Sequence, residues 1–412
     1  MTDAASTPIG PLHQVLRRLL PPGVAPDAWR MLAARGLRAV CDGYMAVLLP
    51  AYLLALGLGQ FEVGLISTAT LLGSAAATLW VGAWGHRVAP RALLCGAALL
   101  MAGTGLGFAG LSSFWPLLVV AFVGTLNPSS GDVSVFLPLE HARIADAAQG
   151  EARTALFARY SVLGALCAAV GALAAAVPDI AHRIAGIDRL DAMRALFVVY
   201  ALTGLAIFRL YRGLPAPAHG SVHAPPAPLG PSRAIVVRLA VLFSVDSFAG
   251  GLVVNALLSL WLLQRFGITL SQAGVFFFWA GLLSAASQFA APQVAARFGL
   301  LNTMVFTHIP ANICLVLAAL APARAAGWVR AQMDVPTRTA YVMGVVTPAE
   351  RTAAASFTAV PRSLASAMSP ALGGALFAAG WISAPMVLCG ALKIAYDLTL
   401  WRAFHMHPPR ED

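Results

Sequence analysis

Long apolar segments alternate with short polar ones along almost the whole chain. A helix that crosses a bilayer needs about 20 mostly apolar residues, and segment after segment has that length. The apolar blocks are continuous rather than alternating, which excludes a β-barrel. The pattern predicts twelve membrane-spanning helices, at residues 32–58, 61–85, 91–111, 114–140, 155–178, 194–212, 235–264, 270–296, 300–321, 324–346, 353–379 and 382–404.

A polar stretch, GLPAPAHGSVHAPPAPLGPSR at residues 213–233, separates two groups of six predicted helices. Its prolines and glycines prevent a packed helix or strand, so it is typical of a linker. We therefore expect five parts in the chain. They are an N-terminal tail (1–28), a six-helix bundle (29–212), the linker (213–233), a second six-helix bundle (234–405) and a C-terminal tail (406–412).

The composition supports an all-α polytopic membrane protein. Hydrophobic residues make up 59% of the chain and charged residues 11%, whereas soluble proteins carry about 25% charged residues. The net charge of +10 would indicate nucleic acid in a soluble protein, but here the arginines lie in short loops. Their asymmetry predicts cytoplasmic termini and a cytoplasmic linker. We expect a bacterial cytoplasmic (inner) membrane location and no nucleic-acid partner.

The motifs of membrane enzymes and ATP-driven pumps are missing from the sequence. It contains no H-E-x-x-H, no G-x-S-x-G and no phosphate loop of the G-x-x-x-x-G-K-[ST] type. The five cysteines lack metal-ligand spacing. We therefore expect no cofactor, no metal and no catalytic residues. A sensor would be expected to add a soluble domain, for which the tails are short.

The two groups of helices resemble each other. Asp42 in the first predicted helix matches Asp246 in the seventh, and Ser74-Ala75-Ala76 matches Ser284-Ala285-Ala286 at a similar offset. Asp132-Val133 likewise parallels Asp334-Val335. Two parallel six-helix repeats are one of the plans of secondary transporters.

With this plan, residues 29–405 resemble a major facilitator superfamily transporter. The family's loop pattern between the second and third helices is G-x-x-x-D-R-x-G-R-[RK], and residues 82–91 read GAWGHRVAPR, with His86 at the acidic position. The second half repeats part of this pattern. The resemblance implies a cytoplasmic gating motif made of Gly82, Arg87, Arg91, Arg297 and Gly299. The helix 4 arginine and helix 5 G-x-x-x-G-P motifs of drug/proton antiporters are absent.

Charged residues inside predicted spans are the candidates for chemistry, because a charge at mid-membrane costs about 2.5–3.5 kcal/mol. In the family resembled, helices 1, 4, 7 and 10 line a central cavity. The candidate substrate- and proton-binding residues are Asp42, Asp132, Asp246, Asn255, Asp334, Arg338 and Arg362. These carboxylates could titrate during transport, or they could form static ion pairs that pin the helices.

Other intramembrane charges are expected to be structural. Arg38 could snorkel to the inner surface, and His308 is expected to be a structural hydrogen-bonding residue. Lys393 and Asp397 are four residues apart, so we expect them to pair with each other.

The function that these features favour is secondary active transport of a small solute by alternating access, as proton-coupled efflux. The alternatives are an organic-anion carrier or a uniporter that uses Arg338 and Arg362, and, less favoured, a non-transporting membrane sensor or enzyme. The expected partners are a small molecule of undetermined type, protons and the lipid bilayer, and the protein is expected to be a monomer.

Overall fold

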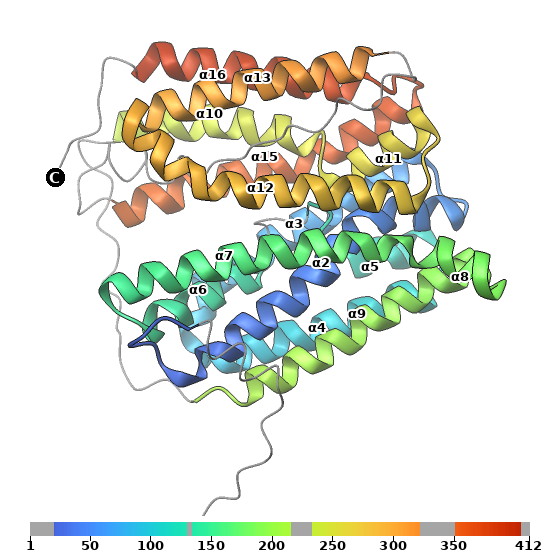
Figure 1. The fold of residues 1–412 in the computed structure, drawn as a ribbon, viewed down its shortest axis with the longest axis horizontal. Helices are drawn as coiled ribbons and strands as arrows, with labels where there is room; N and C mark the ends of the chain where they lie inside the picture. The colour runs from blue at the N-terminus through green and yellow to red at the C-terminus, as the bar shows by residue number, and fades with distance from the viewer. Residues whose placement is uncertain (1–19, 130–133, 216–232, 322–350, 405–412) are drawn as a thin grey trace, which may run out of the picture.

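A computed structural model describes residues 20–129, 134–215, 233–321 and 351–404. All regular secondary structure within these ranges is helical (Figure 1). The predicted span 324–346 and most of the predicted linker lie outside the described residues, as do the candidate site residues Asp132, Asp334 and Arg338.

The N-terminal half, residues 20–215, has helices whose ends follow local signals in the sequence. Pro90 starts α4, where its missing N–H costs nothing, and Gly186 ends α8 with a φ of +66° that favours glycine. The elements are η1 (Pro26–Ala28), α2 (Trp29–Ala55), α3 (Gln60–Trp84), η2 (Gly85–Arg87), α4 (Pro90–Gly110), α5 (Phe114–Val123), α6 (Phe136–Ala147), α7 (Gly150–Leu173), η3 (Ala174–Ala176), α8 (Val177–Ala185) and α9 (Arg189–Arg212).

The C-terminal half, residues 233–404, is built in the same way. Thr269 and Gln272 form a capping box at the start of α12, in which each side chain bonds the other residue's backbone N–H. The elements are α10 (Arg233–Gly251), α11 (Asn255–Phe266), α12 (Leu270–Phe298), α13 (Leu300–Leu320), α15 (Arg351–Ala378) and α16 (Ala384–Phe404).

The fold is that of an all-helical, multi-pass membrane protein. Eight helical segments of the described chain are long and apolar enough to cross a membrane. Large apolar side chains also cover the outer surface, among them Trp115 at 73% exposed and Ile184 at 80% exposed. A soluble monomer rarely exposes apolar surface on this scale, whereas a bilayer provides apolar solvent for it.

The predicted helix 114–140 is wrong as a single helix. The chain forms α5 and α6 instead, and residues 124–129 between them are not helical. Gly124 ends α5, and Pro128 lacks an N–H and disfavours helical backbone at the residue before it. The sequence contained this signal, but the overall apolarity of the segment concealed it.

The predicted helix 235–264 is also interrupted. Its two parts are α10 and α11, and Leu252, Val253 and Val254 connect them. The break follows the pair Gly250-Gly251, and glycine pairs are common sites of helix kinks. The fourth and the seventh predicted helices, which resemble cavity-lining helices, are therefore both discontinuous.

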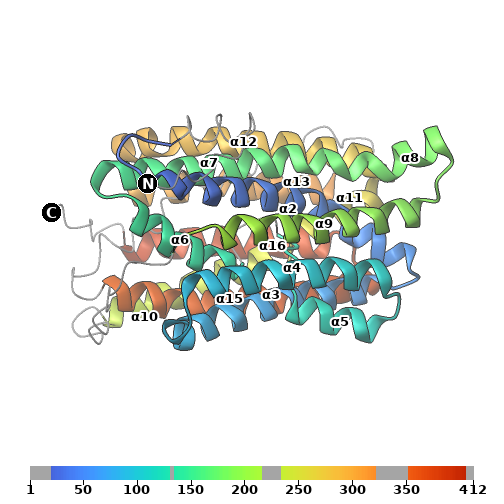
Figure 2. The same cartoon turned by 90° about the horizontal axis from the view of Figure 1, so that it is seen from below.

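The two halves lie side by side, as the blue-to-green and yellow-to-red ribbons of Figure 1 show. Contacts between them are made mainly by α3 with α15 and by α7 with α12. Figure 2 shows these two pairs on opposite edges of the molecule. Within the halves, α2 packs against α7, α4 against α9, α10 against α15, and α13 against α16.

The helices run between two ends of the molecule. At the end called the terminal end below, on the left of Figure 1, lie the start of α2, the end of α9, the start of α10 and the end of α16. At the opposite end lie α8 and the connections α2–α3, α11–α12 and α15–α16.

Glycine permits a close crossing of α2 and α7. A Cβ at Gly43 would overlap the backbone carbonyl oxygen of Ala168, and a Cβ at Gly171 would overlap that of Val40. Backbones can approach this closely in a membrane only where side chains are absent or small. The crossing fixes the height of Asp42, the neighbour of Gly43, within the N-terminal half.

Candidate functional site

The two interrupted helices meet between the halves. The backbone N–H of Ala256, in the first turn of α11, donates to the carbonyl oxygen of Pro128 at 2.9 Å. The side-chain amide of Asn255 donates to the carbonyl oxygen of Ser129 at 3.2 Å. Asn255, a predicted site residue, thus bridges the two halves. Discontinuous helices of this kind form the substrate and ion sites of many transporters, because their free backbone groups can bind ligands.

Hydrogen bonds hold the non-helical segment that follows α5. The N–H of Thr125 donates to Thr104 Oγ1 at 3.2 Å, and the Tyr200 hydroxyl donates to the carbonyl oxygen of Thr125 at 3.1 Å. Asn127 Oδ1 accepts from both the N–H and the hydroxyl of Ser129. These bonds satisfy backbone groups that the broken helix leaves free.

Asp42 lies on α2, which packs against α7 and α9 of its own half and against α11 and α12 of the other half. Its side chain is buried, with the residue 5% exposed. Within the described part of the chain, neither a hydrogen bond nor an ion pair reaches its carboxylate. Arg38 and Arg35 lie one and two turns earlier on α2. Their positive charges lower the free-energy cost of an ionised carboxylate at Asp42.

Arg38 is paired inside the N-terminal half. Its guanidinium donates to Glu140 in a bidentate arrangement, with Nη1–Oε1 at 3.1 Å and Nη2–Oε2 at 2.6 Å. The hydroxyls of Tyr160 and Tyr211 both donate to the same carboxylate, the second at 2.5 Å. The Arg38 guanidinium also lies 4.4 Å from the ring centroid of Phe136. The cluster joins α2, α6, α7 and α9.

The snorkelling expected for Arg38 is wrong, because the residue is 2% exposed and bound to Glu140. The sequence reasoning also missed Glu140. A signal was present, because Glu140 is a carboxylate at the end of a predicted apolar span, and such a charge requires a partner. Which cation it would meet could not be read from spacing, because 102 residues separate the two.

In the C-terminal half, Asp246 of α10 lies 3.7 Å from the ammonium group of Lys393 on α16. Asp397, one turn further along α16, lies 3.7 Å from Nδ1 of His308 on α13. The expected pairing of Lys393 with Asp397 is therefore wrong. Each of the two charges lies within ion-pair distance of a residue on a neighbouring helix.

The last described candidate, Arg362, is half-buried on α15 and follows a proline inside the helix, Pro361. Groups of three or more potential metal ligands are absent from the described residues.

The residues of the predicted gating motif lie at the terminal end. Gly82 has open space around its Cα, and Arg87 in η2 is exposed. Arg91 is half-buried near the start of α4. In the second half, Arg297 lies over the ring of Phe298 at 5.6 Å, and Gly299 makes the turn between α12 and α13 with a φ of +81°.

Hydrogen bonds between the halves lie in the middle of the molecule and at the opposite end. At the opposite end, Gln60 donates to Gln264 at 2.9 Å. Asp179 accepts from both the N–H and the hydroxyl of Ser271 at 3.2 Å. In the middle, the Ser259 hydroxyl donates to the carbonyl of Val47, and the Ala371 N–H donates to Thr68. Across the described ranges, the hydrogen bonds that join the halves follow this distribution, so they hold the halves together at the opposite end.

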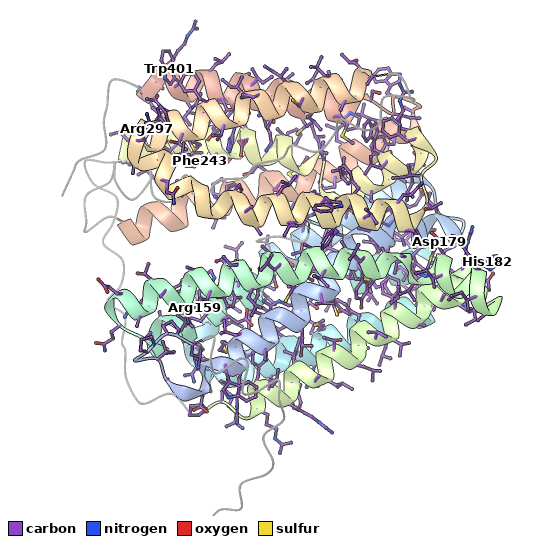
Figure 3. All side chains as sticks on the ribbon, viewed as in Figure 1. Arg159, Asp179, His182, Phe243, Arg297 and Trp401 are labelled. Atoms are coloured by element: carbon purple, nitrogen blue, oxygen red, sulfur yellow. The ribbon has the colours of Figure 1, made fainter. Side chains whose placement is uncertain are left out.

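Asp179 offers a test of this closure. Figure 3 shows it at the end of the molecule that carries α8. Changing Asp179 to Ala removes two bonds to a carboxylate, each worth about 1.5–3 kcal/mol, together with the ion pair to Arg189. We expect the halves to separate at this end, seen as a longer spin-label distance between positions 184 and 381 in a variant without native cysteines.

The matched control is Asp191→Ala, because Asp191 is exposed and pairs within its own helix with Arg194. Its distance distribution should equal that of the parent. If the spin-label distance distribution of Asp179→Ala also equals that of the parent, these bonds do not hold the halves together.

Comparison with known families identifies a match over most of the chain. The family model described as Major Facilitator Superfamily matches residues 31–333. Among curated proteins, an uncharacterized membrane protein of Saccharomyces cerevisiae, YJR124C, is 24% identical over 411 residues, covering 88% of this chain and 91% of that protein.

Several solved structures have the same fold. The nucleoside transporter NupG matches with a TM-score of 0.67 at 11% identity, covering 92% of this chain and 99% of that one. The xylose transporter XylE of E. coli, in an inward open conformation, matches at 0.68 and 15%, covering 93% and 97%. The human organic anion transporter MFSD10 matches at 0.59 and 18%, covering 92% and 100%.

Proposed function

Because the chain belongs to the Major Facilitator Superfamily, we propose that it is a secondary active transporter that exchanges a small solute for protons by alternating access. The two six-helix halves rock about their contacts, and solute binds where the broken helices meet. Both termini face the cytoplasm of a bacterium. The solute moves outward, driven by proton entry.

The proposed proton coupling rests on Asp42, whose buried side chain forms no hydrogen bond with a described residue. An ionised carboxylate that is buried without a hydrogen bond costs several kcal/mol, and the Asp42 carboxylate has none among the described residues. A bound proton removes this cost. Because α2 contacts helices of both halves, a rocking motion changes the surroundings of Asp42, so its proton can be taken up on one side and released on the other.

The hydrogen bonds between the halves indicate which end of the molecule is closed. The hydrogen bonds of Gln60 and Asp179 join the halves at the opposite end. With cytoplasmic termini, closure at this end corresponds to an inward-facing state. The xylose transporter, whose structure is inward open, has a similar fold.

Proteoliposomes with an internal pH-sensitive dye test the proposal. An imposed proton gradient is followed while a nucleoside, a pentose, an organic anion or a lipophilic cation is added. We expect one class of solute to dissipate the gradient, and we expect Asp42→Asn to reduce this proton flux at least tenfold while solute–solute exchange continues. Asp146→Asn, at an exposed aspartate of α6, should behave as the parent.

Full solute-dependent proton flux in Asp42→Asn would overturn the proposal. An organic anion that moves without protons, and stops moving in Arg362→Gln, would favour an anion carrier instead. That alternative has its own basis in the half-buried arginine on α15 and in the fold shared with an organic anion transporter.

A further inference from the structure

A second group of buried and half-buried charges lies in the C-terminal half, separate from Asp42. It consists of Asp246 on α10, His308 on α13, and Lys393 and Asp397 on α16, and it is called the C-terminal charge cluster below. The helices are held together beside it by the contact of Phe243 with Tyr396, whose ring centroids are 6.3 Å apart. Figure 3 shows Phe243 within the upper half of the molecule.

Asp397 is the residue that sets the chemistry of the cluster. It is 0% exposed, and its oxygens accept no hydrogen bond within 3.5 Å from any described residue. Nδ1 of the His308 imidazole lies 3.7 Å from Oδ1 of Asp397, a contact that is an ion pair when the imidazole is protonated. An isolated charge at such a site is very costly, so the pair is stable only when it holds one proton, either on the imidazole or on the carboxylate.

We propose that His308 and Asp397 share one proton and form a protonation site, and that this proton keeps Lys393 paired with Asp246. With the proton bound, Asp397 is neutralised by its own partner. When the proton leaves, Asp397 becomes a bare buried anion one helical turn from Lys393. The ammonium group is then drawn toward Asp397 and away from Asp246, which lies on a helix adjoining the broken-helix site.

Other ionisable groups on the helices around α16 bear on this balance. α16 packs against α10, α13 and α15. Of their described groups, Arg238, Cys314 and Arg402 are exposed, Arg362 is half-buried, and Cys389 is buried one turn before Lys393. The remaining groups on these helices with described side chains are Arg233, which is exposed, and Tyr396, which is buried. His308 of α13 is the titratable group that lies within 4 Å of the Asp397 carboxylate.

The chain offers an unusually clean probe, because Lys393 is its sole lysine. Protein labelled with ¹⁵N-lysine gives one side-chain signal, and it belongs to Lys393. Labelling with ¹⁵N-histidine gives the signals of nine histidines, from which His308 is assigned by its loss in His308→Gln. The two signals are followed between pH 6 and pH 9 in detergent, together with the infrared band of a protonated carboxyl.

At the lower pH values we expect either an imidazolium signal from His308 or a protonated-carboxyl band that disappears in Asp397→Asn. We also expect the Lys393 signal to shift with the same midpoint as this proton. In Asp397→Asn and in His308→Gln the Lys393 shift should be lost. His182→Gln, at an exposed position in α8, should leave both signals unchanged.

A neutral His308 beside an ionised Asp397 across the whole pH range would overturn the proposal. So would a Lys393 shift that persists in His308→Gln. If Asp397→Asn does not fold, as judged by its thermal transition, His308→Gln alone decides the outcome. These readouts need no substrate, so failure here leaves the transport proposal standing, and failure of transport leaves this one standing.

Discussion

Replacing Glu140 with alanine is expected to lower the free energy of unfolding by about 3–5 kcal/mol, the usual effect of removing one partner from a buried ion pair. Arg38 would remain buried with its charge uncompensated, and the hydroxyls of Tyr160 and Tyr211 would lose their acceptor. Four helices meet at this carboxylate, so the loss should appear as a large fall in the midpoint of thermal unfolding in detergent.

Two variants separate this effect from a general loss of charge. Glu151→Ala removes an exposed glutamate from the first turn of α7 and should change the midpoint little. The double variant Arg38→Met/Glu140→Leu should recover much of the stability, since apolar residues of similar size often replace a buried ion pair without loss. A Glu140→Ala protein within about 1 kcal/mol of the parent would contradict the assigned pairing.

Changing Gly43 to alanine is expected to destabilise the protein by about 1–3 kcal/mol, the typical cost of inserting an extra methyl group into a packed core. The added Cβ would overlap the backbone carbonyl of Ala168, so α2 and α7 must move apart. The backbone of a helix cannot relieve the overlap by changing rotamer, as a flexible side chain could. The shift would also displace Asp42, and proton-coupled flux should fall with stability.

Gly36 on the same helix provides the comparison. A Cβ there meets the sulfur of Cys167 at 3.5 Å, an ordinary contact. Gly36→Ala should therefore be neutral or stabilising by up to about 1 kcal/mol, because alanine favours a helix interior over glycine. The measurement is the unfolding midpoint of both variants. Equal midpoints would show that the close crossing of α2 and α7 is not needed.

The class of protein and most helix positions could be predicted, because they depend on local properties. The start of α4 at Pro90 and the end of α12 before Gly299 follow from the preferences of single residues. Every predicted span within the described chain corresponds to a helix or to a pair of helices. Two predicted spans are each divided into a pair of helices. The divisions lie at Gly124 and Pro128 and after Gly250-Gly251, where local backbone preferences end the helix despite the apolar pattern.

The candidate site was predictable only in part. Asp42 and Asp246 could be selected as candidates from the sequence because a charge in an apolar span stands out, whatever surrounds it. Their environments could not be anticipated. Asp42 is buried without an ion pair among the described residues, whereas Asp246 lies beside Lys393, although the sequence comparison matches the two positions.

The amino-acid sequence alone was sufficient to establish a multi-pass helical membrane protein, since the length and apolarity of a span are read within about 20 residues. The pairing of charges emerged from the packed helices. Glu140 meets Arg38 across 102 residues, and Lys393 turns from Asp397 toward Asp246. A buried charge pairs with whatever group helix packing brings within about 4 Å, and that proximity depends on how distant segments assemble rather than on their spacing in the chain.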